Sequence, residues 1–138
     1  MNISLLAIFI ILTPHFIADF VCQTHWQAIN KSKDNNALTQ HVSIYAMCYL
    51  VPMWVLFYRE PFNFWGAVFL AFLFSWITFV SHWVTDFFTS RLNTKLWAKE
   101  ACKPLEDRRP HNFFVAIGFD AVLHYIQLFS TFYLLKSI

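Results

Sequence analysis

Residues 3–21 read ISLLAIFIILTPHFIADFV. This stretch is apolar except at five positions, Ser4, Thr13, Pro14, His15 and Asp19. Because about 20 residues of helix span the hydrocarbon core of a bilayer, this stretch predicts a membrane helix. A cleaved signal peptide is the rival interpretation, and the lack of a basic start and of a small-residue cleavage motif argues against it.

The composition extends this conclusion to the whole chain. Of 138 residues, 58% are hydrophobic and 13% are charged, whereas roughly 25% are charged in ordinary globular proteins. The net charge of +2 and the lack of a basic face interleaved with aromatic residues argue against nucleic acid as a partner. Three cysteines without a CxxC motif, Cys22, Cys48 and Cys102, predict neither a disulfide framework nor a thiolate zinc site.

Three further apolar stretches follow the first. We expect helices over about residues 3–28, 38–58, 62–92 and 112–135, which predicts an all-α, four-helix transmembrane bundle with residues 1–138 as a single domain. Basic residues gather in two of the connections, at Lys31, Lys33, Arg91, Lys95, Lys99, Lys103, Arg108 and Arg109, against Arg59 and Lys136 on the opposite side. The positive-inside rule therefore predicts that these charged loops are cytoplasmic and that both termini lie outside.

One motif recurs in these apolar stretches. His15-Phe-Ile-Ala-Asp19 returns as His82-Trp-Val-Thr-Asp86, and it returns in reverse order as Asp120-Ala-Val-Leu-His124. Side chains four residues apart share one face of a helix, so each pair can aim an imidazole and a carboxylate at one place. At about 1.5 Å per residue, each pair and His41 fall in the inner half of the membrane. Remote segments are thus predicted to bring their ionisable side chains to one depth.

Carboxylates at this depth need partners, because an aspartate at the centre of a membrane helix costs about 2.5–3.5 kcal/mol. The sequence leaves two interpretations open, a metal site and a metal-free set of Asp–His pairs. The predicted metal ligands are His15, Asp19, His41, His82, Asp86, Asp120 and His124. A ligand set of nitrogen and oxygen favours zinc, manganese or iron, zinc first, and seven ligands suit one or two ions. Three residues on the same stripes are predicted to support the ligands or to contact substrate, Gln23, Tyr45 and Gln127.

The ordered set of motifs, HxxxDFxxQ from His15 to Gln23, then His41, HxxxD and DxxxH, resembles a family of small four-helix membrane proteins of unknown function from bacteria and their phages. The resemblance covers nearly the whole chain. Thr89 and Ala121 stand where that family often has Lys and Gln. The motif style is also similar to that of predicted membrane-bound metal-dependent hydrolases. The resemblance implies the inner membrane of a bacterium, or of a phage-infected host, as the location.

Three classes of function remain open. The favoured one is a metal-dependent, membrane-embedded hydrolase of lipid-linked phosphoesters at the inner leaflet, with Asp86 and Asp120 as catalytic residues and membrane lipid as partner. The same side chains could instead relay protons or metal ions in a transporter. The third class is a non-catalytic membrane scaffold or phage accessory protein with a structural metal. The sequence also leaves open whether the chain forms a homo-oligomer.

Overall fold

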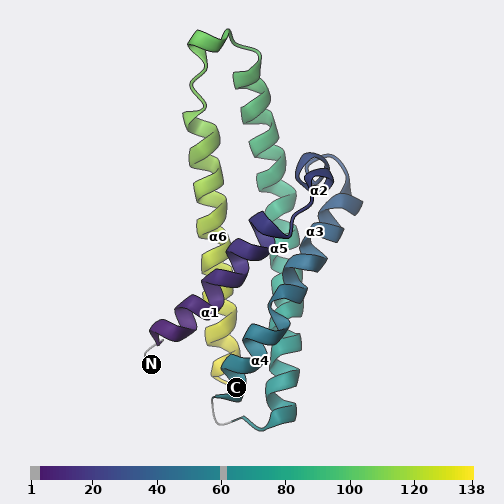
Figure 1. The fold of residues 1–138 in the computed structure, drawn as a ribbon, viewed down its shortest axis with the longest axis vertical. Helices are drawn as coiled ribbons and strands as arrows, with labels where there is room; N and C mark the ends of the chain where they lie inside the picture. Colours follow the sequence, from purple (N-terminus) through teal and green to yellow (C-terminus); the bar gives the residue numbers. More distant parts are fainter. Residues whose placement is uncertain (1–3, 60–61) are drawn as a thin grey trace.

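The computed structural model of the chain describes residues 4–59 and 62–138. Every regular element in these ranges is helical, as predicted (Figure 1). In chain order the elements are α1 (Leu5–Phe16), the π-helix η1 (Ile17–Val21), α2 (His25–Asn30), α3 (Asn35–Cys48), α4 (Leu50–Tyr58), α5 (Phe64–Ala101), the 3-10 turn η2 (Leu105–Asp107) and α6 (His111–Lys136).

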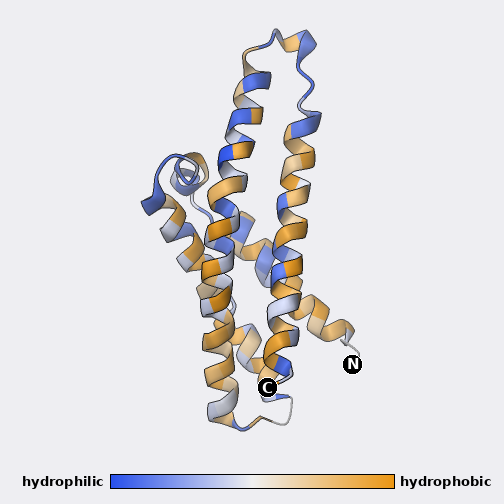
Figure 2. Cartoon of the chain, turned by 180° about the vertical axis from the view of Figure 1, so that it is seen from behind, coloured by the Kyte–Doolittle hydropathy of each residue, from blue (hydrophilic) through white to orange (hydrophobic). Residues whose placement is uncertain are grey.

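Three helical segments are long and apolar enough to cross a membrane. They are the combined α3–α4 segment with 24 residues, α5 with 38 and α6 with 26. Large side chains such as Trp65, Phe69 and Trp76 are exposed on their outward faces, which indicates a lipid environment. Figure 2 shows hydrophobic residues over most of the lower half of the bundle, and hydrophilic residues at mid-height and near the α5–α6 connection. These features are those of a multi-pass membrane protein.

The first apolar stretch differs from the expected continuous helix over residues 3–28; its predicted start at residue 3 lies outside the described residues. The helical stretch Leu5–Val21 is shorter than the three spans, and α1 runs obliquely across α4 and α6 (Figure 1). The chain then breaks, and a new short helix begins behind Thr24. The Thr24 hydroxyl accepts from the Gln27 amide at 3.2 Å, and the Gln27 side chain accepts from the Thr24 amide at 2.9 Å. This reciprocal cap explains why α2 starts afresh.

The second span starts earlier than predicted and is interrupted. Asp34 caps α3, with its carboxylate accepting a hydrogen bond from the Asn36 amide at 2.9 Å. The helix is interrupted at Tyr49, because Pro52 has no N–H to donate to the carbonyl of Cys48. The Tyr49 hydroxyl donates to the carbonyl of Ile11 at 3.0 Å and so ties the interruption to α1.

The long helix α5 continues to Ala101, beyond the predicted end at residue 92. At about 1.5 Å per residue it is about 57 Å long, nearly twice the roughly 30 Å of a hydrocarbon core. Charged contacts order the connection beyond its end: Glu100 accepts from Lys103 at 2.7 Å and from the Arg109 amide at 2.9 Å. The end of the α5–α6 hairpin must therefore stand clear of the hydrocarbon layer.

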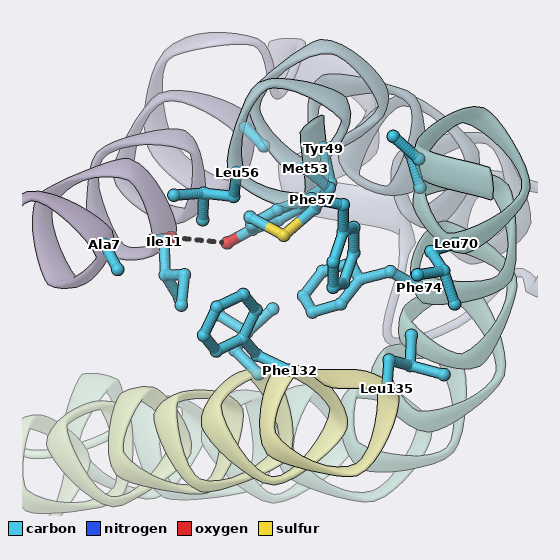
Figure 3. Close-up of a cluster of buried hydrophobic side chains, with 14 of the residues drawn as sticks. Ala7, Ile11, Tyr49, Met53, Leu56, Phe57, Leu70, Phe74, Phe132 and Leu135 are labelled. Carbon is cyan, nitrogen blue, oxygen red and sulfur yellow. Dashed lines mark hydrogen bonds between the residues drawn. The ribbon is translucent and has the colours of Figure 1, made fainter. Parts of the chain in front are cut away.

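The two ends of the bundle are packed differently. The start of α1, the start of α5 and the ends of α4 and α6 lie toward one end, and the α5–α6 connection lies at the other (Figure 1). Figure 3 shows a cluster of apolar side chains pointing at one another from α1, α4, α5 and α6, and Met53, Phe57 and Phe74 within it have no exposed surface. The end at the start of α5 is thus closed by a tightly packed apolar core.

The orientation predicted from the basic loops can be tested with a native reporter. Cys102 is exposed just after α5, whereas Cys22 and Cys48 are half-buried. With both half-buried cysteines replaced by serine, we expect a membrane-impermeant maleimide to label Cys102 in inverted membrane vesicles and not in intact cells, because the positive-inside rule predicts that the basic connection faces the cytoplasm.

A matched variant reports from the other side. In a cysteine-free background, Arg59→Cys should be labelled in intact cells, since Arg59 is exposed at the end of α4. Labelling of Cys102 in intact cells would show that the orientation is the reverse.

Candidate metal centre

Four buried side chains from three segments converge beside the middle of α5. Asp19 comes from η1, His41 from α3, and His82 and Asp86 from α5; one ligand atom of each lies within 4.8 Å of all the others. His41 Nε2 is 3.1 Å from Asp19 Oδ1 and 3.5 Å from Asp86 Oδ2. His82 Nε2 is 3.5 Å from Asp86 Oδ2 and 4.0 Å from Asp19 Oδ1. We call these four residues the first ligand group.

A second ligand group, formed by Asp86, Asp120 and His124, adjoins the first. His124 Nε2 is 3.1 Å from Asp86 Oδ1 and 3.3 Å from Asp120 Oδ1. Asp86 therefore belongs to both groups, with Oδ2 facing the first and Oδ1 facing the second. A carboxylate that presents one oxygen to each of two groups has the geometry of a bridging ligand between two ions.

The spacing of the ligand atoms fits a bound divalent ion. Bonds of about 2.1 Å in tetrahedral geometry place ligand atoms about 3.4 Å apart, and the imidazole–carboxylate separations of 3.1 to 4.0 Å lie around that value. Among the described residues, Asp19 Oδ1, His82 Nε2 and Asp120 Oδ1 are buried and form no hydrogen bond, although buried polar atoms are nearly always paired. These unpaired atoms face other ligand atoms, so the two groups could hold a metal ion.

The π-helix places Asp19 in the site. Its wider turn closes with a hydrogen bond from the Cys22 amide to the Ile17 carbonyl at 2.8 Å, and such turns occur often at functional sites. The wider turn also changes the angle between His15 and Asp19, and His15 lies outside both ligand groups. His15 Nδ1 instead forms a hydrogen bond of 2.6 Å with the Tyr45 hydroxyl. That His15 is a ligand remains a prediction.

The three residues predicted to support the site all lie beside it. Tyr45 stacks on the His82 ring, with centroids 3.8 Å apart. Gln127 donates to the Thr85 hydroxyl and lies 3.4 Å from His124 Nδ1. With its amide oxygen turned toward Lys31 Nζ at 3.3 Å, Gln23 donates to the main-chain carbonyl of Asp19 at 3.0 Å. Each of them restrains a ligand or a neighbour of a ligand, which is how outer contacts orient metal ligands.

Lys31 is the charged site residue that the sequence analysis did not identify. Its ammonium donates to Asp86 Oδ2 at 2.9 Å and lies 3.9 Å from Asp19 Oδ1 and 3.4 Å from His41 Nε2. Burial opposes its charge, but the carboxylates of Asp86 and Asp19 outweigh this and raise the pKa of Lys31 above its ordinary value. One feature of the sequence could have identified Lys31. The excess of intramembrane carboxylates requires a nearby cation, and Lys31 is the first lysine or arginine after the first HxxxD motif.

A cavity of about 420 Å³ opens beside the ligand groups, between α2, α5 and α6. Four charged side chains line part of the cavity, namely Asp19, Asp120, Lys31 and Lys33. Large apolar side chains form much of the remaining wall, namely Phe20, Ile29, Trp97, Phe113 and Ile117. Each ligand group thus contributes one carboxylate to this cavity, whose lining includes both charged and large apolar side chains.

Comparison with known protein families gives a match over most of the chain. The sequence profile of a family described as "Protein of unknown function (DUF3307)" matches residues 6–137. No curated protein and no solved structure matches the chain.

The shared position of Asp86 predicts unequal losses of metal. After loading with Mn²⁺ or Zn²⁺, we expect Asp86→Ala to lose ions from both groups and Asp120→Ala to lose ions from the second group alone. Among the residues that the structure describes, only Asp86 belongs to both groups. Elemental analysis of the purified variants would measure the number of ions per chain. Asp107→Ala, in the exposed η2 turn, is the control, and equal losses in Asp86→Ala and Asp120→Ala would contradict a bridging role.

The hydrogen bond between Tyr45 and His15 predicts a loss of stability. Tyr45→Phe should lower the free energy of unfolding by about 1–3 kcal/mol, because it leaves His15 Nδ1 buried without a partner. Thermal unfolding in detergent would measure the change. Tyr58→Phe, at an exposed tyrosine, should leave the melting temperature unchanged, and an equal effect at both positions would contradict the assignment.

Proposed function

The chain belongs to the DUF3307 family, whose function is unknown, and from the geometry of its site we propose that it is a metal-dependent hydrolase embedded in the membrane. We propose that it cleaves phosphoesters of lipid-linked molecules at the cytoplasmic leaflet. The observation that carries the proposal is the bridging position of Asp86 between two ligand groups, each of which extends a carboxylate into the same cavity.

The ligand set supports hydrolysis of a phosphoester. Divalent ions held by the two ligand groups would activate a water molecule as Lewis acids and would bind the oxygens of a phosphoryl group. Neighbouring side chains restrain the histidine ligands. His82 is fixed by stacking on Tyr45, and His124 is flanked by Asp86, Asp120 and Gln127.

The depth of the site supports a substrate at the membrane surface. Measured from the start of α5 at about 1.5 Å per residue, Asp86 lies about 33 Å along the helix and Trp97 about 50 Å. If the hydrocarbon core covers roughly the first 30 Å, the cavity between these residues lies at the level of the lipid headgroups. We therefore place the reaction at the boundary of the inner leaflet, nearer to water than the sequence analysis predicted.

The lining of the cavity supports an amphiphilic substrate. Lys31 and Lys33 line the cavity together with the carboxylates and can attract an anionic headgroup. The apolar side chains of Trp97, Phe113 and Ile117 can contact the lipid tail. Asp120 is the most accessible of the three site carboxylates, with 16% of its side chain exposed. We propose that Asp120 faces the second ligand group through Oδ1, which lies 3.3 Å from His124 Nε2. Its other oxygen would hold the attacking water and accept its proton, the role of a general base.

The two other classes of function find less support. A transporter needs a polar path to the opposite membrane face, but the end of the bundle beyond the site is closed by the apolar cluster of Figure 3. A purely structural metal site has all its positions filled by protein, whereas both ligand groups here border a cavity.

The experiment that tests the proposal measures phosphate release by the purified protein loaded with Mn²⁺ or Zn²⁺. Lipid phosphoesters with the same headgroup and with either long or short acyl chains are supplied in mixed micelles. We expect turnover of the long-chain substrates, and a loss of at least about 100-fold in kcat for Asp120→Asn, because a general base contributes about 10²–10⁴-fold.

Asp107→Asn, outside the site in η2, should retain full activity and serves as the matched control. Absence of turnover by a protein that holds its full complement of metal would overturn the hydrolase proposal in favour of a structural metal. Ion flux in proteoliposomes that depends on His15 would overturn it in favour of transport.

A further inference from the structure

We infer that Lys31 and a divalent ion are alternative cations for the first ligand group, so that an ion binds there by displacing the ammonium of Lys31. The inference rests on the metal binding in the proposed function and adds to it a residue that controls occupancy. Such a lysine makes the affinity of the site for metal depend on a side chain that is not itself a ligand.

The position of the ammonium carries the inference. Lys31 Nζ lies 2.9 Å from Asp86 Oδ2, 3.9 Å from Asp19 Oδ1 and 3.4 Å from His41 Nε2. These are atoms of three of the four residues of the first ligand group. An ion bonded to the same oxygens at about 2.1 Å would compete with Lys31 for Asp86 Oδ2, which now accepts its hydrogen bond. Two cations this close also repel strongly where little water screens them.

Lys31 is also placed so that it can leave. It follows α2 directly and is anchored by its backbone amide, which donates to the Gln27 carbonyl at 2.9 Å. Its flexible four-carbon stem can swing while this anchor holds. The side chain already lines the cavity of about 420 Å³ together with Lys33, so a displaced ammonium has room there. The fold thus offers the ammonium one position at the carboxylates and another in the cavity.

The test compares Lys31→Met with Lys33→Met, which removes the neighbouring charge in the same cavity without touching the ligand group. Isothermal titration of Mn²⁺ into the detergent-purified, chelator-treated protein measures the dissociation constant. We expect Lys31→Met to bind Mn²⁺ at least about tenfold more tightly than the wild type and Lys33→Met to bind it about as the wild type does. Unchanged or weaker binding by Lys31→Met would overturn the inference.

A second measurement checks the role of Lys31 without added metal. In excess chelator, Lys31→Met should melt about 5 °C or more below the wild type, because the carboxylates of Asp19 and Asp86 lose their ammonium partner. Mn²⁺ should then raise the melting temperature of Lys31→Met more than that of the wild type, and Lys31→Arg should restore the stability in chelator. A melting temperature unchanged by Lys31→Met would count against the inference.

The outcomes separate this inference from the proposed function. If the wild type binds Mn²⁺ and hydrolyses lipid phosphoesters while Lys31→Met leaves Mn²⁺ affinity unchanged, only the inference fails. If Lys31→Met binds Mn²⁺ more tightly and neither protein hydrolyses any lipid substrate, only the hydrolase proposal fails. If no variant binds Mn²⁺, both fail.

Discussion

A buried carboxylate on a helix that crosses a membrane needs positive charge beside it, and Asp86 concentrates this requirement in one residue. Both of its oxygens are enclosed, and they face the ammonium of Lys31 and the imidazoles of His41, His82 and His124. Removing a charge from water costs several kcal/mol unless close partners offset the loss. Four separate segments therefore have to meet at this point, and their meeting fixes how α2, α3, α5 and α6 are arranged.

The repeated motif allowed many residues of the site to be predicted from the sequence. His82 with Asp86 and His124 with Asp120 lie on regular α-helices, where four residues bring side chains onto one face, and both pairs meet as expected. His15 and Asp19 have the same spacing but span the start of a π-helix, where that rule no longer holds. Apart from Pro14, which weakens the helix before it, the sequence around Asp19 gives no indication of the wider turn.

The misses elsewhere have physical causes of the same kind. Lys31 lies in a polar turn, and helical spacing gives no information about where such a side chain points. The break after Val21 depends on the reciprocal hydrogen bonds of Thr24 and Gln27. These bonds can be recognised only when the end of the preceding helix is known. The end of α5 was predicted where apolar residues cease, yet a helix that leaves the bilayer can continue through polar residues to Ala101.

The overhang of α5 has a consequence for how products would leave. The cavity walls include Trp97 on α5 and Phe113 on α6, on the part of the hairpin that stands clear of the hydrocarbon layer. If a lipid-linked phosphoester is cleaved at the site carboxylates, as proposed, neither product needs a channel to leave. In the proposed orientation, the water-soluble product would diffuse directly into the cytoplasm, and the apolar product would diffuse laterally back into the same leaflet.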